Sequence, residues 1–219
     1  MANTSKLTDA AALEQYRVAL ENATNQSEIA TALAELGYDT AKIDEGKALL
    51  TTTRSVYDLK KTEDDETSVA YADFTTKKAE LEDIYSLHRK KAKVVFRKDA
   101  ITAEKLAITG SLPRAYVKWL ETVKKFYTTA AADTAIQTKL ATLKITVEDI
   151  TAANTKVTEL ETARTEYLKE KGESQDATKA KDAAFATMDD WMSEFYAVAK
   201  IALEDNPQLL EALGKVIKS

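Results

Sequence analysis

The sequence predicts an all-α protein built as a tandem duplication of a helical-bundle unit, with antiparallel up-and-down helices. The chain of 219 residues contains five glycines and two prolines, whereas average usage is about 7% and about 5%. Because turns depend on these residues, their scarcity favours long helices joined by few loops. Apolar residues at helical spacing, as at Tyr116, Trp119, Leu120 and Val123, indicate helices with one buried face.

A fixed offset of 107 residues aligns the first half of the chain with the second half. The match includes polar identities, which helical periodicity does not require. Identical residues stand at Ile29 and Ile136, Leu33 and Leu140, Asp83 and Asp190, Ser86 and Ser193, and Lys93 and Lys200. Near Arg54 the register is ambiguous, because an offset of 110 also fits there. We therefore expect one repeat in residues 1–111 and a second in residues 112–219, either as two domains or as one pseudo-symmetric domain.

Each copy is expected to begin with an amphipathic helix, over about residues 8–23 and again over about 113–130. A short helix follows, and Gly37 is well placed to end it in the first copy. Thr40 and Thr146 are each expected to cap a longer helix.

The longer helix is expected to end in a polar turn, "TEDDET" at residues 62–67 and "KGESQD" at residues 171–176. A return helix then covers about residues 67–98 in the first copy and 175–205 in the second. A short helix closes each copy, after Asp99 or after Asn206 with Pro207 at its first position.

Composition excludes several classes of protein. The net charge is −5 and the pI is about 5.2, so the chain lacks the basic character of a nucleic-acid-binding domain. It has no cysteine, which excludes disulfides and thiolate metal sites. The start "MANTSKLTDAAAL" does not resemble a signal peptide, and no apolar run approaches the length of a membrane span. We expect a cytoplasmic protein.

No arrangement of residues typical of an active site is found. His88, the one histidine, stands on an apolar stripe where the second copy has Phe195, so a core position is favoured over a general base. A di-iron bundle needs Glu-x-x-His pairs, but Tyr85 precedes His88 by three residues. The acidic run 63–66 lacks the ligand pattern of a calcium loop and is interpreted as a solvated turn. We expect no catalytic residues, no cofactor and no metal.

Two groups of residues are candidates for contact with a partner or ligand. The densest cationic patch consists of Arg89, Lys90, Lys91, Lys93, Arg97 and Lys98. It could bind phosphate or an acidic partner, or be a solvated face near a helix C-terminus, where cations are favoured. Large aromatic residues concentrate in the second copy, at Tyr116, Trp119, Phe126, Trp191, Phe195 and Tyr196. They could line a ligand cavity or fill an ordinary core.

The ending "NPQLLEALGKVIKS" resembles, from Asn206 to Gly214, the C-terminal ends of a group of uncharacterised bacterial all-helical bundle proteins. The resemblance implies a helical bundle. It implies no activity and no site residues.

The functional hypothesis from the sequence is a non-catalytic interaction or scaffold protein with an unknown protein partner or with self-association. The alternative is a bundle that binds a small apolar ligand or lipid in an aromatic cavity of the second repeat. A component of a pore-forming or surface assembly is a weaker third possibility. The candidate contact residues are Arg89, Lys90, Tyr196, Val198, Trp119 and Trp191.

The two copies differ beside the apolar stripe of the return helix. Arg89, Lys90 and Lys91 correspond to the apolar residues at 196–198 in the second copy. A helix with a wide apolar face is usually buried from more than one side. We therefore expect the flank at 196–198 to be covered by the other half of the chain or another subunit, and the flank at 89–91 to face water.

Overall fold

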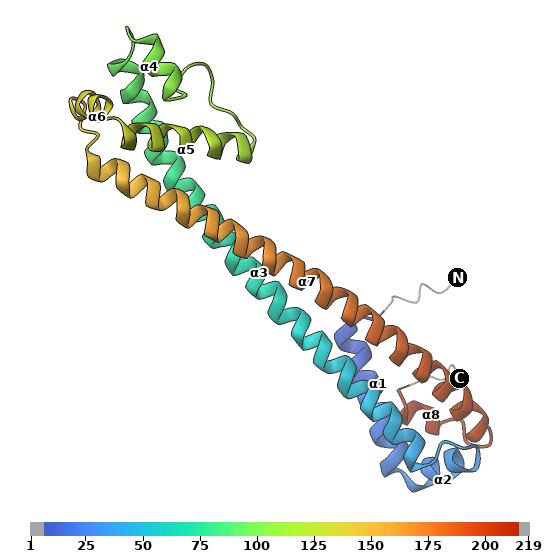
Figure 1. Ribbon diagram of the computed structural model, residues 1–219. Coiled ribbons are helices and arrows are strands. Elements are labelled where there is room, and N and C mark those ends of the chain that lie inside the picture. The colour runs from blue at the N-terminus through green and yellow to red at the C-terminus, as the bar shows by residue number, and fades with distance from the viewer. Residues whose placement is uncertain (1–6, 215–219) are drawn as a thin grey trace. The chain divides into compact units, whose positions relative to one another are not determined.

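The computed structural model describes residues 7–214, and 83% of these residues are helical. No strand occurs among them, which confirms the all-α prediction (Figure 1). Residues 1–6 and 215–219 lie outside the described part of the chain. The N-terminal segment that was assessed as a signal peptide begins in residues 1–6. The C-terminal segment "NPQLLEALGKVIKS", which resembles other helical-bundle proteins, ends in residues 215–219.

The helices follow one another in two similar series. In chain order they are α1 (Asp9–Asn25), α2 (Ser27–Glu35), α3 (Thr40–Val95), α4 (Ala100–Lys105), α5 (Tyr116–Ala132), α6 (Thr134–Ala141), α7 (Val147–Ala202) and α8 (Leu209–Ala212). Adding 107 to the bounds of α1 and α3 reproduces the bounds of α5 and α7. The bounds of these four helices therefore follow the same offset as the sequence, whereas α8 begins two residues later than the offset from α4 would place it.

Helices α3 and α7 each run for 56 residues without interruption. The polar turns expected at 62–67 and 171–176 are therefore wrong. These stretches contain no proline, and Gly172 is their one glycine, so their polar side chains suit a solvated helix as well as a turn. An ion pair between Lys60 and Asp64, one turn apart, further supports the helix at this point.

The chain divides into two compact units, and the division falls in the middle of the two long helices. Unit 1 comprises residues 1–64 and 173–219, and unit 2 comprises residues 65–172. Each unit thus contains segments from both halves of the chain, and the repeat boundary expected at residue 111 falls inside unit 2.

Contacts within each unit pair α3 with α7 in a regular order. In unit 1, Thr53 donates to the Ala184 carbonyl at 3.4 Å and Ser174 donates to Asp64 at 2.9 Å. In unit 2, Thr67 donates to the Glu170 carbonyl at 3.1 Å and Lys156 donates to Glu80 at 2.7 Å. Residue numbers on α7 therefore fall as those on α3 rise, within each unit.

Each unit has its own aromatic core. In unit 2, Tyr85, Phe126 and Tyr127 pack edge to face, with ring centroids 5.0 to 6.1 Å apart. In unit 1, Trp191 stacks on Phe195 with a centroid distance of 5.6 Å, beside Tyr38. Such pairs stabilise a core by about 0.5–1.5 kcal/mol beyond their burial.

The helix ends agree in part with the local signals in the sequence. Gly37 follows α2 with a φ of 86°, as predicted for a C-terminal glycine. Thr146 accepts from the Asp149 backbone N–H at 3.2 Å and caps α7, as predicted. In contrast, Asp39 rather than Thr40 caps α3, and α8 begins at Leu209 rather than at Pro207.

Candidate interaction surface

Unit 2 carries an exposed cationic surface at the end of α3 and the start of α4. We define this cationic surface by three cations and three apolar residues: Lys90, Arg97, Lys98, Leu87, Val94 and Ile101. Leu87, Lys90 and Val94 recur at helical spacing and share one face of α3. The exposed fractions of Leu87, Val94 and Ile101 are 52%, 59% and 72%. Cations and large apolar side chains are therefore interleaved in contact with solvent.

The other three cations of the predicted patch have local structural roles. Arg89 donates to the carbonyls of Thr109 and Gly110 at 3.3 and 2.9 Å. Lys93 donates to the Gly110 carbonyl at 3.2 Å, and Lys91 to a backbone carbonyl at residue 144. These side chains therefore hold the segments that follow α4 and α6.

In contrast, Lys90, Arg97 and Lys98 make no ion pair with any residue in the range 7–214. Lys139 of the same unit, in comparison, does form an ion pair, and its ammonium lies 3.4 Å from the Asp99 carboxylate. The three cations are thus available to an external carboxylate.

Two of the three equivalent positions of unit 1 carry the opposite charge, and the position of Lys90 is occupied by Ala197. At the offset of 107, Arg97 and Lys98 correspond to Glu204 and Asp205, and Val94 corresponds to Ile201. Ile201 is 65% exposed, and both carboxylates are exposed. The Asn206 amide donates to Glu28 at 3.4 Å, so α2 lies against this turn in unit 1. We define the acidic surface as Glu28, Ile201, Glu204 and Asp205.

The flank of α7 at residues 196–198 is covered in part. Tyr196 is 6% exposed and its hydroxyl donates to the Leu213 carbonyl at 3.0 Å. Val198 is half-buried against the core of unit 1, which includes residues of α1 and α8. The burial predicted for this flank is therefore found for Tyr196 and in part for Val198. The prediction is wrong for Ala197, which is exposed.

On the corresponding flank of α3, Lys90 is exposed as predicted. Arg89 and Lys91 are half-buried, because their side chains reach backbone carbonyls. The sequence alone could not distinguish these three neighbours.

The large aromatic residues are divided between the two units. Trp119 is 3% exposed in the core of unit 2, where the Lys78 ammonium lies 5.2 Å from its ring. Trp191 belongs to unit 1, where it packs against the core together with Phe195. Each set fills the core of its own unit. A ligand cavity made by these residues stays a prediction without further support.

A groove of about 340 Å³ lies between α1 and α3 in unit 1. It is lined by Leu13, Glu14, Arg17, Leu50, Thr51 and Arg54. Its two arginines are already paired, Arg17 with Glu14 and Glu21, and Arg54 with Asp58. The groove therefore offers no unpaired cation to an anionic ligand.

His88 lies in the core of unit 2, as predicted. It is 7% exposed, and its Nδ1 lies 3.0 Å from the Tyr127 hydroxyl. Burial lowers the pKa of the His88 imidazole and raises the pKa of the Tyr127 phenol. The position corresponds to Phe195, so a histidine–tyrosine hydrogen bond stands here where unit 1 has an aromatic ring.

We expect the stability to fall as the pH drops below the ordinary histidine pKa of about 6.5, because the pKa of His88 is lower in the folded state than in the unfolded chain. Because His88 binds one proton, the free energy of unfolding can change by at most about 1.4 kcal/mol for each pH unit. His88→Phe should remove this pH dependence, as measured by urea unfolding at several pH values. The same slope in wild type and variant would assign the dependence to other groups.

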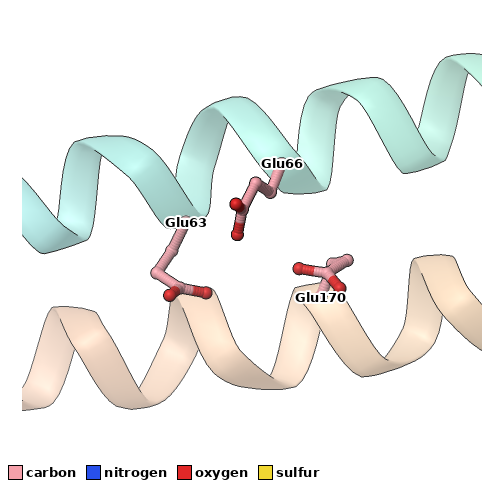
Figure 2. A group of neighbouring side chains, drawn as sticks. All are labelled: Glu63, Glu66 and Glu170. Carbon is pink, nitrogen blue, oxygen red and sulfur yellow. The ribbon is translucent and has the colours of Figure 1, made fainter.

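Glutamates of α3 and α7 approach one another near the division between the units. Figure 2 shows Glu66 and Glu170, which both belong to unit 2, and Glu63 one turn earlier on α3. Carboxylate oxygens of Glu66 and Glu170 lie within 4.8 Å, a spacing that suits a hard cation. However, the Lys169 ammonium lies 2.8 Å from the Glu170 carboxylate and already supplies a counter-charge. Glu170 was not predicted, because its place depends on how α7 packs against α3.

Comparisons of this chain with protein families, curated proteins and solved structures find no match. Among the described residues, none of the helices combines the length and the apolar character needed to cross a membrane.

Proposed function

We propose that this chain is a non-catalytic interaction protein that binds an acidic protein partner through the cationic surface of unit 2. The observation that carries the proposal is that Lys90, Arg97 and Lys98 make no ion pair within residues 7–214 and lie among three exposed apolar side chains. Charged residues steer and select a partner, and apolar residues supply the buried centre of an interface.

A solvated helix end explains this surface less well. The helix dipole favours cations near a C-terminus, but it gives no reason for exposed Leu87, Val94 and Ile101 on the same surface. Contiguous exposed apolar side chains with a polar rim are typical of protein-binding sites. A membrane surface is the other acidic partner to consider, but the apolar residues here are flanked by folded segments rather than by a free amphipathic helix.

The architecture supports the same proposal. We infer a tandem duplication from the shared offset in sequence and helix bounds, and an antiparallel α3–α7 pair from the order of their contacts. Unit 1 forms equivalent helices without cations at the positions of Lys90, Arg97 and Lys98. The fold therefore does not need these cations, which supports a role for them in binding.

The proposal is tested with a fluorescently labelled polyglutamate peptide and the full chain at low salt. We expect binding that weakens as salt rises, and a loss of at least about tenfold in affinity for the triple variant Lys90→Glu, Arg97→Glu, Lys98→Glu. Fluorescence anisotropy measures the affinity.

The matched control is Lys118→Glu, Lys125→Glu, Lys171→Glu, which changes the net charge by the same amount at exposed lysines outside the cationic surface. It should bind like wild type. Equal losses in the two triple variants, or no binding by wild type, would contradict the proposal.

A further inference from the structure

The two units present equivalent ends with opposite charge. In unit 2, residues 87–105 and 134–146 contain nine lysines and arginines and two carboxylates. In unit 1, the equivalent residues 194–212 and 27–39 contain one lysine and seven carboxylates. The chain as a whole has a net charge of only −5, so this separation is not a result of overall composition.

Contacts inside each unit bring the two charged segments together. In unit 2, Lys139 of α6 pairs with Asp99 at 3.4 Å and its ammonium lies 5.6 Å from the Phe96 ring. In unit 1, Asn206 contacts Glu28 of α2. Each end is therefore one continuous surface built from a short helix and the end of a long helix.

An exposed apolar residue stands at the same place on both surfaces. Val94 of the cationic surface and Ile201 of the acidic surface are equivalent, and their exposed fractions are 59% and 65%. A branched apolar side chain surrounded by charge can form the dehydrated centre of an interface. The charged residues around it would set the orientation and exclude a like-charged surface.

We propose that the acidic partner is a second copy of this chain, whose acidic surface in unit 1 binds the cationic surface in unit 2 of the first copy. This inference rests on the proposed function, since it names the partner of the same cationic surface. The charges of the two surfaces are complementary, and each surface includes an exposed apolar residue at the same position of the repeat.

Such a contact joins two different surfaces, so each associated pair still has one free surface of each kind. Association through heterologous surfaces continues beyond a dimer unless a ring closes. We therefore expect a concentration-dependent series of species rather than one dimer. The association should weaken at high salt, because exposed charges are screened over about 3 Å at 1 M and about 30 Å at 0.01 M ionic strength.

Sedimentation velocity of the full chain measures this association at low and high salt. We expect larger species at low salt that disappear at high salt. The triple variant Lys90→Glu, Arg97→Glu, Lys98→Glu should remain monomeric at low salt, because both of its surfaces are acidic. The triple variant Glu28→Lys, Glu204→Lys, Asp205→Lys should also remain monomeric, because both of its surfaces are basic. The control variant at Lys118, Lys125 and Lys171 should associate like wild type.

Mixing the two monomeric variants gives the sharpest test. The acidic surfaces of one variant then meet the basic surfaces of the other, so association should return in the mixture. This result also shows that both variants are folded, because a misfolded variant could not complement. Two monomeric variants that stay monomeric when mixed, while circular dichroism shows native helix content in both, would overturn the inference.

The polyglutamate experiment separates this inference from the proposed function. Peptide binding by a chain that stays monomeric at low salt would overturn self-association and leave an acidic partner of another kind. A chain that neither binds the peptide nor associates would overturn both.

Discussion

Replacing Gly46 by alanine is expected to lower the free energy of unfolding by about 2 kcal/mol, although alanine is the better helix former. A Cβ at Gly46 would lie 2.4 Å from Trp191 Cη2 and 2.6 Å from Cζ3. No side chain tolerates such distances, so the Trp191 ring or the helix must move. Because Trp191 is stacked on Phe195, the movement would disturb the core of unit 1. Urea unfolding of Gly46→Ala measures the change.

Gly172 provides the matched control. It lies in the interior of α7, and a Cβ there would meet nothing within 4 Å. Gly172→Ala should therefore raise the free energy of unfolding by about 0.5–1 kcal/mol, since alanine restricts the unfolded chain. This increase would also support the continuous helix, at a place where the sequence suggested a turn. Equal shifts for the two variants would contradict the close packing at Gly46.

A second substitution tests whether Trp191 causes the loss. The positions of Gly46 and Trp191 correspond to Ala153 and Ile84 in unit 2. Unit 1 therefore combines a residue without a side chain and a large ring, whereas unit 2 has two side chains of intermediate size at these positions. Trp191→Ile should cost less in the Gly46→Ala background than in wild type, with a coupling energy of about 1–2 kcal/mol. Additive effects would place the strain of Gly46→Ala elsewhere.

A second large loss of stability is expected when Val198 is replaced by a charged residue. Because Val198 is half-buried against the core of unit 1, Val198→Glu should lower the free energy of unfolding by about 2 kcal/mol. Its neighbour Ala197 is exposed on the same helix. Ala197→Glu should change the stability by less than about 0.5 kcal/mol. Thermal melting of the two variants measures the difference, and similar melting temperatures would show that the flank is not covered.

Local features of the structure could be predicted from the sequence. Scarce glycine and proline and the helical spacing of apolar residues predicted the all-α fold, because helix formation depends mainly on neighbouring residues. Gly37 and Thr146 could be assigned to helix ends for the same reason. His88 could be placed in the core from the apolar stripe that surrounds it. The tandem duplication stays a prediction, which the common offset of the helix bounds supports.

Polar segments could not be interpreted in the same way. The stretches at 62–67 and 171–176 are polar both as turns and as solvated helix, so their sequence does not distinguish the two. Packing of α3 on α7 decides, since Ser174 donates to Asp64 and Thr67 donates to the Glu170 carbonyl. The long helices therefore continue where periodicity alone suggested that they end.

The helical class, the helix ends at Gly37 and Thr146, the core position of His88 and the presence of the cationic patch could be predicted from the amino-acid sequence. Which cations are available depends on the tertiary structure, because Arg89, Lys91 and Lys93 donate to backbone carbonyls of other segments. It also decided that Tyr196 is covered while Ala197 is exposed. The physical reason is that helix formation is local, whereas the neighbours of a side chain depend on how whole helices pack.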